Sequence, residues 1–195
     1  MPKILILGAN GQLARNTIPF FLKHPDVQLT LYLRRANRLK NPDPARVTIV
    51  DGDVLDEENL KRAMQGQDVA YANLAGAMAQ QAEIIVNAMH ATGLKRLIFI
   101  SSMGIYDEVP GERYHSALDP YRDSAAAIEA SGLDYTLLRP VWFTHDDEIN
   151  YQITQKGEPF KGHDVSLNSL SDLIVKLALT PGMEVRHSLG VSRAG

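Results

Sequence analysis

Residues 3–15 are Lys3-Ile4-Leu5-Ile6-Leu7-Gly8-Ala9-Asn10-Gly11-Gln12-Leu13-Ala14-Arg15. Ile4 to Leu7 form the kind of apolar run that is typical of a fully buried parallel strand. The run ends in Gly-x-x-Gly-x-x-Ala, and a helix-compatible segment follows directly. Glycine at positions 8 and 11 permits a tight turn and lets backbone N–H groups approach a phosphate at the positive end of the next helix. The order of strand, glycine turn and helix therefore predicts a dinucleotide site rather than a plain β-turn.

The composition bounds the class of protein. The 195 residues are 45% hydrophobic and 22% charged, with a net charge of −3 and no cysteine. These values are ordinary for one globular domain, and the lack of cysteine excludes disulfides, thiolate metal sites and a cysteine nucleophile. The sequence has no block of like charges, so a nucleic-acid partner is not expected. It has no apolar stretch long enough to span a bilayer and no recognisable signal peptide, so a membrane partner is not expected either. A cytoplasmic location is expected.

Strand-like and helix-like segments alternate along nearly the whole chain. This alternation predicts an α/β fold: a Rossmann-like, doubly wound parallel sheet in a single domain over residues 1–195. We expect helix N-caps at Asp56, Asp119 and Ser169. The expected strands are residues 3–7, 28–33, 46–50, 69–72, 96–100 and 135–138, and the expected helices are residues 12–23, 57–64, 80–92, 121–130 and 169–179. In such a fold the ligand binds beyond the carboxyl ends of the strands.

The end of the second expected strand indicates which dinucleotide binds. An acid at this place binds the ribose 2′-hydroxyl of NAD, but here the strand continues into Arg34-Arg35 with no acid in reach. Guanidinium groups bind phosphate in a bidentate manner, so the pair favours NADPH over NADH. The alternative is that the two arginines are only a solvated loop.

Several motifs resemble one known family. The Gly-x-x-Gly-x-x-Ala turn is similar to the opening of extended and atypical short-chain dehydrogenases/reductases, with Asn10 where they commonly carry threonine. Residues 131–140, Ser-Gly-Leu-Asp-Tyr-Thr-Leu-Leu-Arg-Pro, resemble the family's Ser-Gly-Leu-x-Tyr-Thr-x-x-Arg-Pro. The likeness covers nearly all of the chain and is strongest to the small atypical members with an NAD(P)H-binding, NmrA-like domain. That group includes biliverdin reductase B/flavin reductase-like proteins and NADPH-sensing regulators.

The resemblance implies a role for each loop at the carboxyl ends of the strands. The glycine turn would hold the pyrophosphate, Asp53-Val54 the adenine, and residues 73–76 the ribose and phosphate region. Pro140 would orient the nicotinamide, and Trp142 would form a wall for a flat acceptor. Asp53 as a turn residue and Trp142 as ordinary packing remain open. The expected cofactor-binding residues are Gly8, Asn10, Gly11, Gln12, Leu13, Arg34, Arg35, Asp53, Val54, Asn73, Leu74, Ala75, Gly76, Ser101, Pro140 and Trp142.

Residues 100–106, Ile-Ser-Ser-Met-Gly-Ile-Tyr, resemble the family's Ser-Ser-x-x-x-Tyr segment. When Tyr106 is aligned with the tyrosine of that segment, the family's catalytic hydroxyl falls at Ser102. This hydroxyl could hydrogen-bond a substrate carbonyl. Alternatively, Ser101 and Ser102 only satisfy backbone groups at a strand end.

The family's proton donor is missing from this chain. No Tyr-x-x-x-Lys occurs, and counting back from residues 131–140 places its two positions at about Ala117 and Tyr121. Possible substitutes, each also explained as a structural or surface residue, are Tyr106, Tyr114, His115 and Tyr121. The absence favours flavins and quinones as acceptors, because they accept hydride without a dedicated protein acid.

The leading hypothesis is an NADPH-dependent reductase of a flat conjugated acceptor such as a flavin or a quinone, with a pocket formed partly by residues 140–195. The alternative is a non-catalytic NADP(H) sensor that acts on a protein partner. A sugar-nucleotide epimerase or dehydratase is less favoured, because only about fifty residues follow Pro140. The acidic run after His145 is interpreted as a solvated loop rather than a metal site, because contiguous carboxylates cannot all face one ion.

Overall fold

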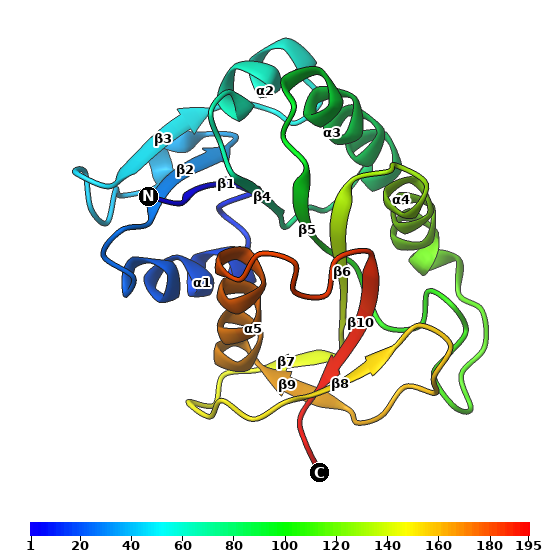
Figure 1. Ribbon diagram of the computed structural model, residues 1–195. Helices are drawn as coiled ribbons and strands as arrows, with labels where there is room; N and C mark the ends of the chain where they lie inside the picture. The colour runs from blue at the N-terminus through cyan, green and yellow to red at the C-terminus, as the bar shows by residue number, and fades with distance from the viewer.

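Eight strands form the central sheet in the order β3-β2-β1-β4-β5-β6-β10-β8 in the computed structural model, which describes residues 1–195 (Figure 1). Every neighbouring pair is parallel except β8 and β10. The strands of this sheet are β1 (Lys3–Leu7), β2 (Gln28–Leu33), β3 (Val47–Asp51), β4 (Val69–Ala72), β5 (Arg96–Ile100), β6 (Asp134–Pro140), β8 (Gln152–Gln155) and β10 (His187–Ser192). A separate parallel pair, β7 (Trp142–Thr144) and β9 (Asp164–Ser166), lies beyond the end of β6.

Helices cover both faces of the sheet (Figure 1). On one face α1 (Gln12–Leu22) packs beside α5 (Leu167–Leu179), and on the other lie α2 (Glu57–Met64), α3 (Met78–Thr92) and α4 (Asp119–Glu129). The alternation of side chains along β1 supplies both cores, because Ile4 and Ile6 join the α1–α5 side while Leu5 and Leu7 join the other. The predicted doubly wound α/β fold is therefore confirmed.

Strand order reverses at β1, which pairs with β2 on one side and β4 on the other. The helix that follows β1, α1, covers one face of the sheet, and the helix that follows β4, α3, covers the other. A crevice therefore opens at the carboxyl ends of β1 and β4. Gly8, the first residue after β1, lies at this point. The topology therefore places the glycine turn where a doubly wound sheet binds its ligand.

The predicted helix N-caps have mixed outcomes. Asp56 caps α2, and its carboxylate accepts from the N–H of Asn59. Asp119 is not a cap: it is the first residue of α4, and its carboxylate accepts from the Tyr114 hydroxyl instead. The cap of α5 is Ser166 rather than Ser169, because the helix begins at Leu167 and Ser166 Oγ accepts from the Ser169 N–H at 3.0 Å.

The sequence prediction also missed β7 to β10. Three of these four strands have three or four residues, too few to show a period-two pattern clearly. None of the helices is both long and apolar enough to cross a bilayer.

A buried ion pair ties the loop after β5 to the last strands of the sheet. The guanidinium of Arg139, which is fully buried, pairs with Glu108 and donates from Nε to Ser188 Oγ at 3.0 Å. The same Ser188 oxygen lies 2.8 Å from the hydroxyl of Tyr106, whose pKa is raised by burial. Charges this deep are tolerated only when each one is paired. The loop is therefore held to β6 and β10 by polar contacts.

We expect Glu108→Ala to lower the free energy of unfolding by about 3–5 kcal/mol, because it leaves the Arg139 charge buried and unpaired. The matched control is Asp107→Asn, which breaks the more exposed pair of Asp107 with Arg122 and keeps a residue that tolerates the positive φ of position 107. The control should cost less than about 1 kcal/mol. Urea denaturation measures both, and equal losses would contradict the structural role of the buried pair.

Candidate functional site

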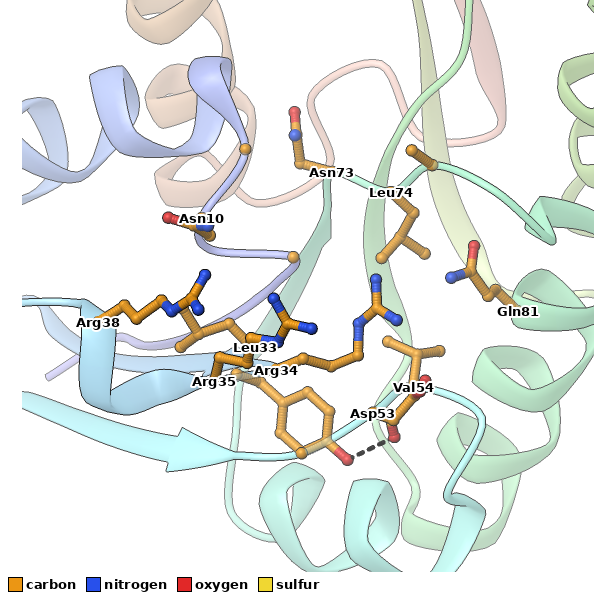
Figure 2. Close-up of a pocket in the computed structure, with 15 residues that line it drawn as sticks. Asn10, Leu33, Arg34, Arg35, Arg38, Asp53, Val54, Asn73, Leu74 and Gln81 are labelled. Carbon is orange, nitrogen blue, oxygen red and sulfur yellow. Dashed lines mark hydrogen bonds between the residues drawn. The ribbon is translucent and has the colours of Figure 1, made fainter.

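A cavity of about 460 Å³ opens at the carboxyl ends of β1 to β4 (Figure 2). It is lined by ten residues that the sequence analysis proposed: Gly8, Asn10, Gly11, Arg34, Arg35, Asp53, Val54, Asn73, Leu74 and Ala75. Five further lining residues were not proposed: Tyr32, Leu33, Arg38, Gly52 and Gln81. Residues from four separate loops are thus brought together at one place.

The glycine turn packs directly against the loop after β4. A Cβ atom added to Gly8 would lie 2.1 Å from the carbonyl oxygen of Asn73, and one added to Gly11 would lie 2.2 Å from Asn73 Nδ2. Gly8 also has a φ of +74°, which disfavours other residues. Asn73 is itself fixed, because its N–H donates to the Leu7 carbonyl at 2.9 Å. Close approach to backbone therefore requires glycine at position 8, whereas a Cβ at position 11 would meet only the end of the Asn73 side chain.

The first turn of α1 is free of competing anions. Its N-cap, Gly11, offers no side-chain hydrogen bond, and the first turn contains no acidic residue. By contrast, α2 is capped by Asp56 and begins with Glu57 and Glu58. The leading N–H groups of α1 therefore remain available to a phosphate, which is the group that a dinucleotide presents to this turn.

Three arginines from the end of β2 and the turn after it face the cavity: Arg34, Arg35 and Arg38 (Figure 2). Arg35 has a φ of +56°, and the short 3₁₀ turn Ala36–Arg38 then brings Arg38 back toward the cavity. No carboxylate lies within ion-pair distance of the three guanidinium groups. This arrangement is cationic and unneutralised, which suits a phosphate monoester.

Tyr32, in β2, supports the loop after β3 through a hydrogen bond to its backbone. Its hydroxyl donates to the Asp53 carbonyl at 2.8 Å, and Asn59 Nδ2 donates to the same hydroxyl at 3.3 Å. Burial raises the pKa of Tyr32 to about 12, so the donor proton is retained at neutral pH. A Cβ at Gly52 would lie 2.5 Å from the Tyr32 ring. Asp53 also has a turn role, because its Oδ1 accepts from the Leu55 N–H at 2.9 Å.

The residues assigned to the nicotinamide end lie outside this cavity. Ser101 is 3% exposed and its Oγ has no hydrogen-bond partner, while Ser102 Oγ donates to the Met103 carbonyl at 3.1 Å. The loop after β5 is joined to the last residue of β6 by a hydrogen bond from the Met103 N–H to the Pro140 carbonyl at 3.2 Å. Trp142, in β7, is 72% exposed.

The remaining proposed positions also lie outside the cavity lining. Leu13 is buried in the core on the α1–α5 side, so only its backbone could meet a ligand. Gln12 and Gly76 are exposed, the first as the opening residue of α1 and the second in the loop after β4.

Two of the tyrosines considered as proton donors, Tyr106 and Tyr114, are engaged elsewhere, whereas the hydroxyl of Tyr121 makes no hydrogen bond. The hydroxyl of Tyr106 lies 2.8 Å from Glu129 Oε1 as well as from Ser188 Oγ. Tyr114 donates to the Asp119 carboxylate, and this hydrogen bond raises the pKa of Tyr114. His115 precedes the 3₁₀ turn Ser116–Leu118, and Tyr121 lies in the first turn of α4.

The acidic run after His145 forms ion pairs rather than a cluster of ligands. Asp146 and Glu148 both pair with Arg193. No group of three or more histidine and carboxylate side chains is arranged to hold a metal ion.

Similarity to known proteins agrees with this geometry. A family model described as NAD(P)H-binding matches residues 8–181. A Rossmann-fold NAD(P)-binding family protein from Shigella flexneri is 42% identical, with a TM-score of 0.89 over 100% of this chain and 95% of that one. A short-chain dehydrogenase/reductase from Veillonella parvula, solved in complex with NADP, is 26% identical, with a TM-score of 0.91 over the same shares.

Curated relatives are more distant. A Bacillus subtilis protein described as an uncharacterized sugar epimerase is 25% identical over 71% of each chain. An isoflavone reductase homolog of Nicotiana glauca is 27% identical over 72% of this chain and 48% of its own length. The chain therefore spans about half the length of the isoflavone reductase homologs that it matches.

The fold and the site define an NAD(P)-binding protein of the short-chain dehydrogenase/reductase type, as the motif resemblance predicted. The chain belongs to the NAD(P)H-binding family whose model it matches over residues 8–181.

We expect Gly8→Ala to abolish measurable NADPH binding, because the added Cβ would displace the Asn73 backbone as well as strain a positive φ. The matched control is Gly66→Ala, which has a φ of +76° but nothing within 4 Å of the added Cβ. Titration of NADPH fluorescence compares the two variants after circular dichroism has confirmed that both are folded. Similar affinities for the two would refute the importance of this close approach.

Proposed function

We propose that this protein is an NADPH-dependent reductase of a flat conjugated acceptor such as a flavin or a quinone. The observation that carries the proposal is the cavity at the carboxyl ends of β1 to β4, with three unpaired arginines and no acid at the end of β2. A carboxylate there would favour a ribose hydroxyl, whereas guanidinium groups favour a 2′-phosphate. When bound, the reduced nicotinamide supplies hydride.

The residues of the chain have separate tasks in this proposal. The glycine turn and the first turn of α1 bind the diphosphate, Arg34, Arg35 and Arg38 bind the 2′-phosphate, and the loop supported by Tyr32 binds the adenine. Asp53 offers a carboxylate to the adenine amine, and Val54 offers an apolar surface to the ring.

On the acceptor side, Ser102 orients the substrate, and the buried Ser101, whose hydroxyl has no hydrogen-bond partner, is assigned to the nicotinamide end. The end of β6 is joined to the Ser102 segment by the hydrogen bond from the Met103 N–H to the Pro140 carbonyl, which holds Ser102 and Pro140 near each other. The exposed indole of Trp142 provides an aromatic face for a planar ring. Residues 140–195 would form the rest of the pocket.

The absence of Tyr-x-x-x-Lys restricts the chemistry. A simple carbonyl needs a proton donor as it accepts hydride. Tyr106 is held by Glu129 and Ser188 and Tyr114 by Asp119. Tyr121 has Ala125 four residues on, where the family's motif has its lysine. Flavins and quinones draw protons from solvent, so they match the groups present. The same absence is what supports the second candidate, a sensor that binds NADP(H) without turnover.

The deciding experiment is anaerobic oxidation of NADPH and NADH with FMN, riboflavin and a short-chain quinone. Anaerobillin joins the panel because a protein of Escherichia coli O157:H7 with the same fold, 19% identical, is described as an anaerobillin reductase. Saturable turnover with a preference for NADPH is expected. NADPH binding without turnover of any acceptor would favour the sensor.

We expect Arg34→Asp to weaken NADPH binding by roughly tenfold or more while NADH binding changes little, because only NADPH carries the 2′-phosphate. The control is Lys95→Asp, the same charge reversal at an exposed position just before β5. This position lies at the amino ends of the strands, whereas the cavity lies at their carboxyl ends. Dissociation constants for both cofactors, measured at one ionic strength, separate a local contact from a general charge effect. Equal losses for NADPH and NADH in Arg34→Asp would disprove the assignment.

A further inference from the structure

Residues 145–151, the segment between β7 and β8, are held by hydrogen bonds to the start of α5. Ser166 Oγ donates to the Glu148 carbonyl at 2.6 Å. The N–H of Asn150 donates to Ser169 Oγ at 2.9 Å. Two backbone groups of an irregular segment are thus satisfied by buried serines, which fixes the path of the chain.

A second fastening comes from Arg193, near the end of the chain. Its Nη2 lies 2.9 Å from Asp146 Oδ2, and its Nε lies 2.9 Å from Glu148 Oε1 and 3.2 Å from Asp164 Oδ1. One exposed pair contributes little, but several carboxylates on one guanidinium form a network whose ordering cost is shared. Residues 145–148 are therefore held from both sides.

This fastening places His145 against the glycine turn. The imidazole Nε2 of His145 lies 2.8 Å from Nε2 of Gln12, a residue 133 positions earlier in the chain. Gln12 is the first residue of α1 and directly follows Gly11. Because an amide nitrogen can only donate, the imidazole nitrogen accepts in this pair, and a flip of the amide would let the imidazole donate instead.

We propose that His145 is a cofactor-binding residue, which reaches over the first turn of α1 and donates a hydrogen bond to the diphosphate of NADP(H). The inference rests on the family's NAD(P)H binding and adds a contact from the far end of the chain. An anion at the uncapped N–H groups of α1 would lie beside Gln12, within reach of the imidazole that already touches it. Neither residue is buried, so both side chains are free to exchange partners.

The consequence is a cofactor held between α1 and the segment that follows β7. The imidazole would have to leave before the diphosphate could, so its loss should act mainly on the dissociation rate. Arg193 touches neither Gln12 nor the glycine turn in this structure, and it would act as a positioning residue for His145.

The test measures NADPH binding and dissociation by nicotinamide fluorescence with purified full-length variants. We expect His145→Ala to weaken NADPH binding roughly 5- to 20-fold, mostly through faster dissociation, since a hydrogen bond to a charged group is lost. His145→Asn retains a donor and should recover part of the affinity. Arg193→Met should change the dissociation rate in the same direction by a smaller factor. His24→Ala, at an exposed histidine just after the last turn of α1 and outside the cavity lining, is the matched control.

A ligand that lacks the diphosphate separates binding from folding. Adenosine 2′-monophosphate keeps the adenine and the 2′-phosphate, so its affinity should be unchanged in His145→Ala. Equal weakening of both ligands, or unchanged NADPH binding in a folded His145→Ala, would overturn the inference and leave the contact with Gln12 a structural tie. Failure of the unaltered protein to bind NADPH would instead contradict the proposed function.

Discussion

The close approach of two backbone loops at the switch point is the constraint on which the site depends. Gly8 leaves β1 with a positive φ and lies against the Asn73 carbonyl at a distance that admits no Cβ atom. Because β1 and β4 are hydrogen-bonded neighbours, the loops that follow them meet there, while β2 and β3 lie on the other side. The glycine turn, the arginines after β2 and the loop after β3 share one cavity because of this packing.

A polar network performs a comparable task at the other end of the sheet. Arg139 and Glu108 are buried together, and Tyr106 and Ser188 complete their hydrogen bonds. These residues tie the loop that follows Ser102 to β6 and β10. The hydroxyl of Tyr106, the tyrosine of the Ser-Ser-x-x-x-Tyr segment, is thus already hydrogen-bonded to Glu129 and Ser188 in this network.

Much of the fold was predictable because its signals are local. Buried parallel strands are continuous apolar runs, and the bounds of β1, β2, β4 and β5 were predicted as they stand. The cap at Asp56 was predictable for the same reason. The caps of α4 and α5 were placed wrongly, because an acid or a serine near a helix start fits several neighbouring positions. The short strands β7, β8 and β9 are defined by their partners, so their own sequence gave little indication of them. The six-residue β10 was missed as well.

The sequence by itself determined the strand–glycine–helix opening, the order of elements and the positions of the loops that face the cavity, because each depends on residues adjacent in the chain. Arg38 was not predicted to line the cavity, because its approach depends on the positive φ of Arg35 and on the turn that follows. Only the tertiary structure decided that Tyr32 supports Asp53, that Trp142 is exposed, and that His145 meets Gln12. These contacts join residues far apart in the chain, so no local pattern encodes them.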